Sequence, residues 1–470
     1  MEVTVPVNNH YYENSFFSEN DLKNRFGTRG KKFEAQKNRL FSSVFELTTH
    51  HSNLKKLKLF GFKDLKGKKE EERLILKLYS KEHLGGEKQY IVQTGLYAGV
   101  IYHKGCKFNI TTRYGDAFLR RMLNFVNDIY IDNQKTPSSK NQKVNDFEFI
   151  IAYLFIQSFE KAAVLGLPHE YQTLTQKSNK VRGKVDINTY IKTNIPFRGS
   201  ITSTYREQVY IQEVVDVLYL TCKKLESKFG REIHRRLLSI TQLLKQHYSG
   251  RFTSKDTILK AKSHRALHNP MYASFRKVLE YAEIILLQLE LDANEEQNRL
   301  ETYGFLFDIS QLFELYLEKL LSKHFSEWDV NSQEELPLYK SMFYGRRMFP
   351  DIVMKHKSSG KIAVFDAKFK TMRMLKDDLD RSDFYQIHTY MHYYGSNVMI
   401  GGLIYPLSEQ LNSAKAHSES LFGNNERKET KFIVDGVHVS DDMDMSHLIQ
   451  QEDIFLSRLG KNLVHADYLD

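Results

Sequence analysis

Hydrophobic residues change their spacing along the chain, and this spacing predicts where strands and helices lie. Between residues 89 and 112, β-branched and aromatic residues are interrupted by glycines, which predicts strands with a hairpin at 103–105. Hydrophobic residues recur at helical spacing over 116–126 and 146–165, and largely so from 206 to about 291. We therefore expect an N-terminal β-rich region followed by a central helical region.

The C-terminal third alternates between helical and strand patterns. The predicted elements are a helix over 308–324, strands over 347–356 and 361–370, a helix over 381–393, and strands over 398–405 and 431–439. This order is typical of a mixed sheet flanked by helices. The expected fold class is an α+β or α/β multidomain protein.

The length of 470 residues exceeds one ordinary core, so several domains are expected. Polar connectors and changes of pattern divide the chain into four regions. These are residues 1–88, of unknown role, the β-rich region 89–190, the helical region 191–300, and the mixed-sheet region 301–470.

The charge balance favours a polyanionic partner. Lys and Arg number 68 against 58 Asp and Glu, which gives a net charge of +10. Phosphate neutralisation is the sequence-independent part of nucleic-acid affinity, although many soluble proteins carry a similar excess. The run from Leu54 to Arg73 interleaves basic residues with Leu and Phe. It is either a solvated helix or hairpin face, or a patch that contacts phosphates.

Several function classes are disfavoured. Two cysteines, Cys106 and Cys222, cannot build a four-thiolate metal site. No apolar stretch reaches the roughly 20 residues that span a bilayer, and no signal peptide is evident, so we expect a cytoplasmic protein with no membrane partner. No G-x-x-x-x-G-K-[ST] loop occurs, so we expect this chain to bind no nucleotide.

The stretch from Phe349 to Lys370 gathers charged residues on two strands joined near Ser358-Ser359-Gly360. A loop of Ser358-Ser359 places Asp351 opposite Asp366, whereas a loop over 358–361 places Asp351 opposite Lys368. Either loop puts Asp351, Asp366 and Lys368 on one face, because side chains alternate along a strand, but a three-residue loop would not. Opposed Cβ atoms lie ~4.5–5.5 Å apart, so two carboxylates could share one cation.

Two close carboxylates repel each other unless a cation lies between them. Mg²⁺, with Mn²⁺ as a substitute, favours a couple of carboxylates plus water and phosphate oxygens. It acidifies a bound water, and Lys368 would add a positive charge beside a phosphate. The alternative is a hairpin with incidental surface charges. That alternative explains Asp366 less readily, because Asp366 ends an apolar strand.

Pro350-Asp351, fourteen residues, and Asp366-Ala367-Lys368 together resemble the PD-(D/E)xK nuclease motif. Gln386 and Tyr390, four apart on one helical face, resemble the Q-x-x-x-Y element of RecB-type members. The helix with Glu314 lies where the superfamily often has a further acidic residue. The expected catalytic residues are Asp351, Asp366, Lys368, Glu314 and Gln386, with Asp351 and Asp366 as metal ligands. The residues expected to contact DNA are Lys370, Arg381, Arg347 and Tyr390.

A narrower resemblance covers roughly residues 90–410. The segments 312–316, 349–354, 364–370, 383–386 and 402–406 resemble the nuclease domain of the McrC family, the endonuclease subunit of McrBC-type modification-dependent restriction systems. This resemblance implies a Mg²⁺-dependent endonuclease that cuts double-stranded DNA. It also implies a partner, a McrB-like AAA+ GTPase that forms a hexameric ring and is stimulated by this subunit.

The same resemblance makes residues 89–190 the partner-binding region and residues 301–470 the PD-(D/E)xK nuclease domain. Two other functions remain open. The chain could be an autonomous RecB-type DNA repair nuclease, or a non-catalytic adaptor of the motor whose nuclease-like domain only docks DNA or the motor.

Overall fold

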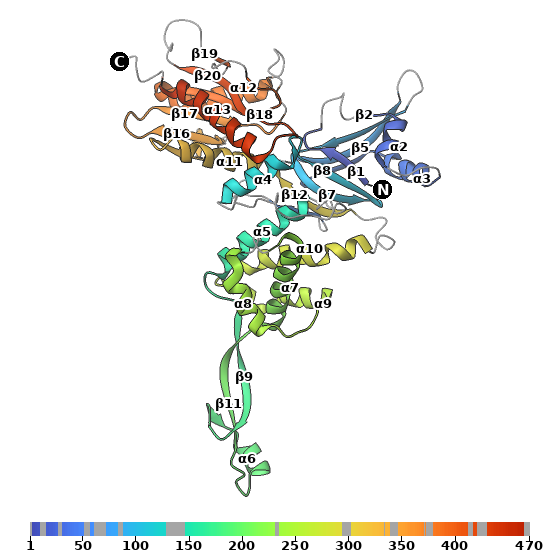
Figure 1. Ribbon diagram of the computed structural model, residues 1–470, viewed down its shortest axis with the longest axis vertical. Coiled ribbons are helices and arrows are strands. Elements are labelled where there is room, and N and C mark those ends of the chain that lie inside the picture. Colours follow the sequence, from blue (N-terminus) through green and yellow to red (C-terminus); the bar gives the residue numbers. More distant parts are fainter. Residues whose placement is uncertain are drawn as a thin grey trace. The chain divides into compact units, whose positions relative to one another are not determined.

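The computed structural model describes residues 2–9, 16–26, 31–50, 57–60, 72–82, 88–127, 146–230, 235–293, 302–332, 334–338, 346–370, 372, 379–411, 417–420 and 430–464. The chain divides into two compact units. Unit 1 comprises Met1–Tyr130 and Glu296–Asp470, and unit 2 comprises Ile131–Glu295. Unit 2 is the middle of the chain, coloured teal to yellow in Figure 1.

Unit 1 contains two sheets built mainly from N-terminal residues. The strands of the first sheet are, in order, β1 (Glu2–Pro6), β8 (Cys106–Thr111), β7 (Tyr97–His103), β12 (Tyr303–Asp308) and β4 (Leu57–Phe60). Those of the second are β2 (Phe16–Phe17), β6 (Lys88–Thr94), β5 (Leu74–Glu82) and β3 (Phe45–Thr48). The helices among them are α2 (Glu19–Phe26), α3 (Lys31–Phe41) and α4 (Gly115–Asn127). The β pattern at 89–112 and the helix at 116–126 are confirmed.

The predicted hairpin between these strands is also confirmed. His103 pairs with Cys106, and Lys104 and Gly105 between them have φ of 47° and 79°. Such left-handed pairs are typical of two-residue hairpin turns. Of the basic run from Leu54 to Arg73, the structure describes 57–60 and 72–73, and the rest lies outside the described residues.

The third sheet of unit 1 is mixed, as predicted. Its strands are, in order, β13 (Trp328–Asn331), β16 (Ile352–His356), β17 (Ile362–Ala367), β18 (Val398–Leu407), β20 (Lys431–His438) and β19 (His417–Ser420). β17, β18 and β20 run parallel to one another, whereas β13, β16 and β19 pair antiparallel to their neighbours. The accompanying helices are α11 (Ile309–His324), α12 (Arg381–Tyr394), η5 (Gly395–Asn397) and α13 (Met445–Val464).

The prediction of one strand over 347–356 was wrong. The chain forms β15 (Arg346–Met348), which pairs with β14 (Leu336–Leu338), and then β16 from Ile352. Pro350 lies in the gap between β15 and β16. Proline lacks the N–H that a continuous ladder needs, which accounts for the break.

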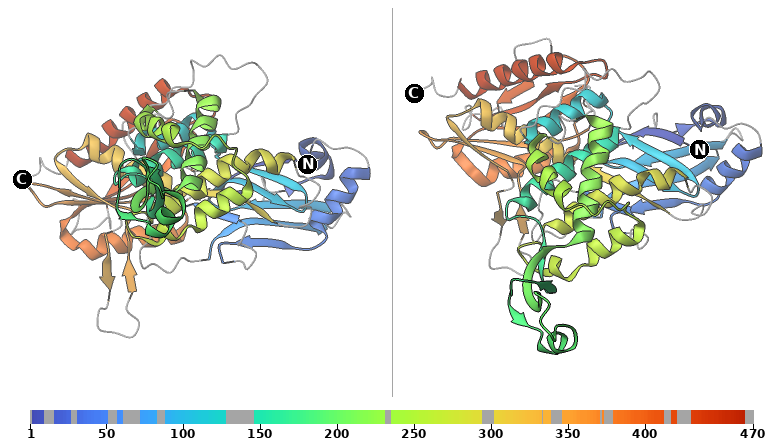
Figure 2. Two further views of the ribbon diagram at one scale, coloured as in Figure 1. Left: turned by 90° about the horizontal axis from the view of Figure 1, so that it is seen from below. Right: turned by 60° about the horizontal axis from the view of Figure 1, so that its bottom comes forward.

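Helices pack on the sheet through buried apolar residues. α12 contacts β17 and β18, while α13 contacts β20 and β18 and α11 contacts β17 and β13. Figure 2 shows α12 and α13 on opposite faces of the sheet. A Cβ at Gly401 of β18 would lie 2.2 Å from Met391 Sδ, so a larger residue there would require the Met391 side chain of α12 to move.

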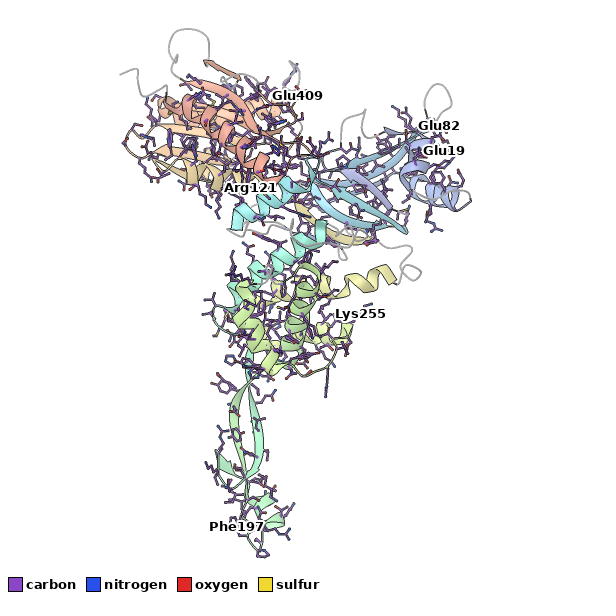
Figure 3. The ribbon with its side chains drawn as sticks, in the orientation of Figure 1. Glu19, Glu82, Arg121, Phe197, Lys255 and Glu409 are labelled. Carbon is purple, nitrogen blue, oxygen red and sulfur yellow. The ribbon has the colours of Figure 1, made fainter. Side chains whose placement is uncertain are left out.

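Buried ion pairs attach α13 to the rest of unit 1. Arg458 donates from Nη2 to Asp435 Oδ1 at 2.8 Å and to the Gly436 carbonyl at 2.9 Å. Arg121 of α4, labelled in Figure 3, donates to Glu452 at 2.7 and 2.5 Å. The Tyr316 hydroxyl of α11 donates to the same carboxylate at 2.6 Å. These contacts hold α4, α11 and α13 together.

Unit 2 is a helical bundle with one long hairpin. Its helices are α5 (Asp146–Ala163), α6 (Ile187–Thr193), α7 (Gln212–Phe229), η3 (Arg235–Leu237), α8 (Leu238–His247), α9 (Lys255–Ser263), η4 (Arg265–His268) and α10 (Phe275–Ala293). The hairpin pairs β9 (His169–Ser178) with β11 (Ile201–Tyr210), and the short β10 (Lys184–Val185) lies beside β11. The helical prediction from 206 was wrong for residues 206–210, which continue β11, a strand rich in Thr, Tyr, Ile and Val.

We predict that replacing Arg458 with Met lowers the free energy of unfolding of unit 1 by about 3–5 kcal/mol, because the buried Asp435 carboxylate would lose its guanidinium partner. Denaturant unfolding followed by tryptophan fluorescence or circular dichroism measures this change. The control is Glu82→Gln, which removes the exposed ion pair with Lys88 and should cost below about 1 kcal/mol. Equal, small effects of both variants would contradict the assigned role of Arg458.

Candidate active site

The site is built on the pairing of β16 with β17. The register pairs Ile352 with Phe365 and Lys355 with Ile362, and the His356 N–H donates to the Lys361 carbonyl at 2.9 Å. Extended by one residue, this register places Asp351 opposite Asp366. The first of the two predicted registers is therefore confirmed, although the loop spans residues 357–360. The register with Asp351 opposite Lys368 is wrong.

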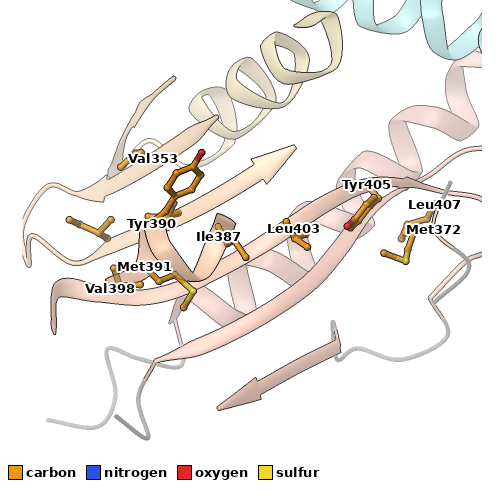
Figure 4. Packing of buried hydrophobic residues seen from close by; sticks show 11 residues of the cluster. Val353, Met372, Ile387, Tyr390, Met391, Val398, Leu403, Tyr405 and Leu407 are labelled. Atoms are coloured by element: carbon orange, nitrogen blue, oxygen red, sulfur yellow. The ribbon is translucent and has the colours of Figure 1, made fainter. Parts of the chain in front are cut away.

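Alternation along the strands directs the acidic side chains toward α12. Val353 and Val364, which oppose each other, belong to the buried cluster that includes Ile387 and Tyr390 of α12 (Figure 4). Asp366 lies two residues after Val364, and so on the same face. Every residue of β17 is buried, and the Asp366 side chain is fully so.

Lys368 lies at the centre of the polar contacts. Its Nζ is 2.5 Å from Asp366 Oδ2, 3.2 Å from Gln386 Oε1 and 3.5 Å from Asp383 Oδ1. Burial alone would lower the pKa of Lys368, but the adjoining Asp366 carboxylate outweighs it and raises that pKa above its ordinary value. The ammonium is therefore charged at any physiological pH.

Asp351 lies near two other carboxylates and the Lys368 ammonium. Burial, followed by the nearby Glu314 and Asp366 carboxylates, raises the pKa of Asp351 well above its ordinary value. One of its oxygens, Oδ2, accepts a hydrogen bond from the Ala367 N–H at 2.9 Å. Asp366 Oδ1 is buried and accepts no hydrogen bond. Buried carboxylate oxygens without donors are costly unless a cation occupies the adjoining space.

These residues fit a hard divalent cation. Among the described residues, no group of three or more His, Cys, Asp or Glu side chains is arranged to hold a metal ion. Mg²⁺, however, binds through one or two carboxylates and completes its shell with water and phosphate oxygens. Asp351 and Asp366 supply two such ligands. Among the described residues, none donates a hydrogen bond to the buried Oδ1 of Asp366.

Gln386 and Tyr390 form the α12 side of the site. Gln386 Nε2 donates to the Tyr390 hydroxyl at 2.7 Å, and that hydroxyl donates to the Phe349 carbonyl at 3.4 Å. Burial raises the pKa of Tyr390 to about 12. Tyr390 thus both packs in the core and orients Gln386, which in turn accepts from Lys368.

Six of the predicted residues line one pocket of about 560 Å³. They are Glu314, Asp351, Asp366, Lys368, Lys370 and Gln386. Lys370 forms an ion pair with Asp383 there. Tyr390 lies behind Gln386. Arg347 and Arg381 do not line this pocket: Arg347 is exposed and pairs with Glu335 at 3.1 Å, and Arg381 is the exposed first residue of α12.

Several pocket residues were not predicted from the sequence, among them Asp383 and a set of N-terminal residues. Asp383 contacts both lysines of the pocket, and its position three residues before Gln386 on the helix was a usable signal. The N-terminal residues are Asn8, Arg73, Leu74, Gly95 and Leu96. Their distance in sequence from the motif leaves no local pattern that would reveal them.

Comparisons with known proteins agree with this fold. The family model described as McrBC 5-methylcytosine restriction system component matches residues 92–406, more than half of the chain. A chain from the Thermococcus gammatolerans half-complex of McrB AAA+ hexamers with bound McrC is 14% identical, with a TM-score of 0.52. That match covers 98% of this chain and 100% of the other.

A chain from the Thermococcus gammatolerans McrBC complex solved by cryo-EM is 13% identical over 70% of this chain and 89% of the other, with a TM-score of 0.31. A search of curated proteins finds no match. In the described part of the chain, none of the helices has the length and apolar content to cross a bilayer.

We predict that Asp351→Asn stabilises the metal-free protein at pH 8 and not at pH 4. The folded state holds the Asp351 proton more tightly than the unfolded state, whose pKa is near 3.8, so stability is lost as pH rises above that value. Asparagine cannot ionise, yet its Oδ1 can still accept from Ala367. Thermal unfolding in EDTA at both pH values measures the difference. If Asp351→Asn changed the thermal stability by the same amount at pH 4 and at pH 8, the claim that neighbouring carboxylates raise the pKa of Asp351 would be wrong.

Proposed function

Since the chain belongs to the McrBC 5-methylcytosine restriction system component family, we propose that it is the metal-dependent DNA endonuclease subunit of a McrBC-like restriction complex. The observation that carries this proposal is the convergence of Asp351, Asp366 and Lys368 at the end of β17, with Glu314 and Gln386 in the same pocket. A pocket with two candidate metal ligands and a charged lysine suits phosphodiester hydrolysis of double-stranded DNA.

Asp351 and Asp366 would hold the divalent cation, Mg²⁺ or Mn²⁺. When bound, such an ion supplies a water of lowered pKa and neutralises charge on the phosphate. Lys368 keeps its proton and places a fixed positive charge where negative charge develops on the phosphoryl oxygens. Gln386 and Asp366 orient that ammonium, and Tyr390 orients Gln386. Glu314 adds a third carboxylate, suited to orienting a water molecule.

The proposed partner is a hexameric McrB-like AAA+ GTPase, since the similar Thermococcus gammatolerans chain comes from McrB AAA+ hexamers with bound McrC. Unit 2 offers an apolar surface for protein binding. Ile187, Ile191, Ile195 and Phe197, in and after α6, expose 63%, 57%, 65% and 60% of their surface. Figure 3 labels Phe197 at the end of the β9–β11 hairpin that lies beside α6 and away from α7 and α8. Neighbouring exposed apolar residues of this kind mark protein-interaction sites.

We predict that Asp366→Asn lowers DNA cleavage by the complex at least about 100-fold, since loss of a direct metal ligand should exceed the 10–100-fold cost of losing a ligand's hydrogen-bond partner. Partner binding and stimulation of its NTPase should persist. The matched control is Asp329→Asn, an exposed carboxylate of the same sheet, which should cut at the parental rate.

The outcome distinguishes the three functions. Cleavage by Asp366→Asn at the parental rate would contradict the assignment of Asp366. Cleavage by the unmodified chain alone, without nucleotide or partner, would favour an autonomous RecB-type repair nuclease. A complex that binds DNA but never cuts it, in Mg²⁺ or Mn²⁺, would favour the non-catalytic adaptor.

We also predict that Ile191→Ser combined with Phe197→Ser weakens binding to the AAA+ hexamer by at least about tenfold, because two exposed apolar contacts are lost. Size-exclusion chromatography and calorimetric titration with the partner measure this. Phe252→Ser, which removes another exposed apolar side chain of unit 2, is the control and should bind normally. Unchanged affinity of the double variant would exclude α6 and its following loop as the partner surface.

A further inference from the structure

The candidate active site has a second wall made by N-terminal residues. Asn8, Arg73, Leu74, Gly95 and Leu96 line the same pocket as Asp351 and Asp366. All of them belong to unit 1. Arg73 lies outside residues 92–406, the part of the chain that the family model matches. It therefore brings a cation to the pocket that the nuclease motif does not contain.

Backbone contacts hold Arg73 firmly in this position. The Arg73 N–H donates to Thr49 Oγ1 at 3.0 Å, and the Arg73 carbonyl accepts from the Thr49 N–H at 3.0 Å. Gly95, between β6 and β7, lies against the backbone of Leu74, the residue after Arg73. A Cβ at Gly95 would lie 1.8 Å from the Leu74 carbonyl oxygen, so only glycine permits this approach.

An ion pair with α11 orients the guanidinium. Arg73 Nη1 lies 3.0 Å from Asp308 Oδ2, while Asp308 Oδ1 caps α11 by accepting from the Gln311 N–H at 3.2 Å. Asp308 is 3% exposed, but the Arg73 side chain is 49% exposed. Asp308, Tyr97 and Glu314 thus surround part of the guanidinium, while about half of the Arg73 side chain stays exposed and lines the pocket. Arginine carries five N–H donors in a planar fork that matches phosphate oxygens.

The metal-free pocket is rich in carboxylates, which oppose the approach of DNA. Four carboxylates line it: Glu314, Asp351, Asp366 and Asp383. The cations on the nuclease side are Lys368 and Lys370, and both already form ion pairs with pocket carboxylates. DNA that enters this pocket would meet an excess of negative charge from the nuclease side alone. Arg73 forms its ion pair with Asp308, which is not among the lining residues, and lies near Glu314, so it adds a third cation to the pocket.

We infer that Arg73 binds a backbone phosphate of the DNA and thereby positions it over Asp351 and Asp366. This inference rests on the proposed nuclease function and extends it to a part of the chain for which the sequence analysis left the role open. The basic run from Leu54 to Arg73 was interpreted either as a solvated face or as a patch that contacts phosphates. For Arg73, its last residue, the inference favours phosphate contact.

The test measures the salt dependence of DNA binding, which a merely structural role of Arg73 would not alter. Binding of a double-stranded DNA fragment to the full chain is measured in EDTA, where no cleavage occurs, over a range of KCl concentrations. For Arg73→Gln we expect the slope of log K against log [salt] to fall by about one, the effect of losing one phosphate contact. Affinity should fall about 10- to 100-fold. Arg73→Lys should keep most of the slope.

Lys77→Gln is the matched control. Lys77 lies on β5, pairs with Glu46 at 2.7 Å and does not line the pocket. The slope of log K against log [salt] for Lys77→Gln should therefore equal that of the parent protein. With the partner and Mg²⁺, Arg73→Gln should raise the KM for DNA more than it lowers kcat. Thermal unfolding identifies any loss of fold, and Arg73→Lys, which can keep the pair with Asp308, remains informative if Arg73→Gln unfolds.

An unchanged slope and an unchanged KM in Arg73→Gln, while the parent complex cuts DNA, would overturn the role of Arg73 and leave the nuclease proposal standing. The role of Arg73 would also be overturned if Arg73→Lys lowered the slope of log K against log [salt] by about one, the contribution of a whole phosphate contact. If the parent complex itself cuts no DNA in either metal ion, the proposed function fails, independently of Arg73.

Discussion

The pairing register of β16 with β17 is the constraint on which the site depends. A slip by one residue would send either Asp351 or Asp366 to the opposite face of the sheet, because side chains alternate along a strand. The core prevents such a slip. β17 and β18 are buried along their whole length, and helices cover both faces, so a shift of β17 would bring Lys361 or Lys368 into a buried position. The packing of the sheet thereby holds two carboxylates within reach of one another.

This arrangement is unfavourable for the metal-free protein, and that cost is typical of functional sites. Asp351 has a raised pKa because burial and two neighbouring carboxylates disfavour its charged form. Lys368 offsets part of the repulsion through Asp366, and Arg73 adds a cation from the N-terminal sheets. The guanidinium of Arg73 comes from a segment far in sequence from the carboxylates and the ammonium. Unit 1 therefore has to fold as a whole before the pocket exists.

Local patterns in the sequence were sufficient to predict most elements of unit 1 and the core of the site. The alternation around Asp351 and Asp366, and the turn residues between them, identified the hairpin and its possible registers. Local patterns did not predict the break at Pro350, where the missing N–H of one residue ends a strand. They also did not predict that residues 206–210 continue a strand before the following helix begins. They could not reveal long-range partners either. Arg73 and Asp308 meet although they are 235 positions apart.

The central claim is that Asp351 and Asp366 share one divalent cation. Anomalous diffraction from crystals of the protein grown with Mn²⁺ tests it most directly. We expect one anomalous peak bound by an oxygen of each carboxylate at about 2.0–2.3 Å, with Lys368 beside it. No peak there at saturating Mn²⁺, or a peak bound by other residues alone, would contradict the assignment.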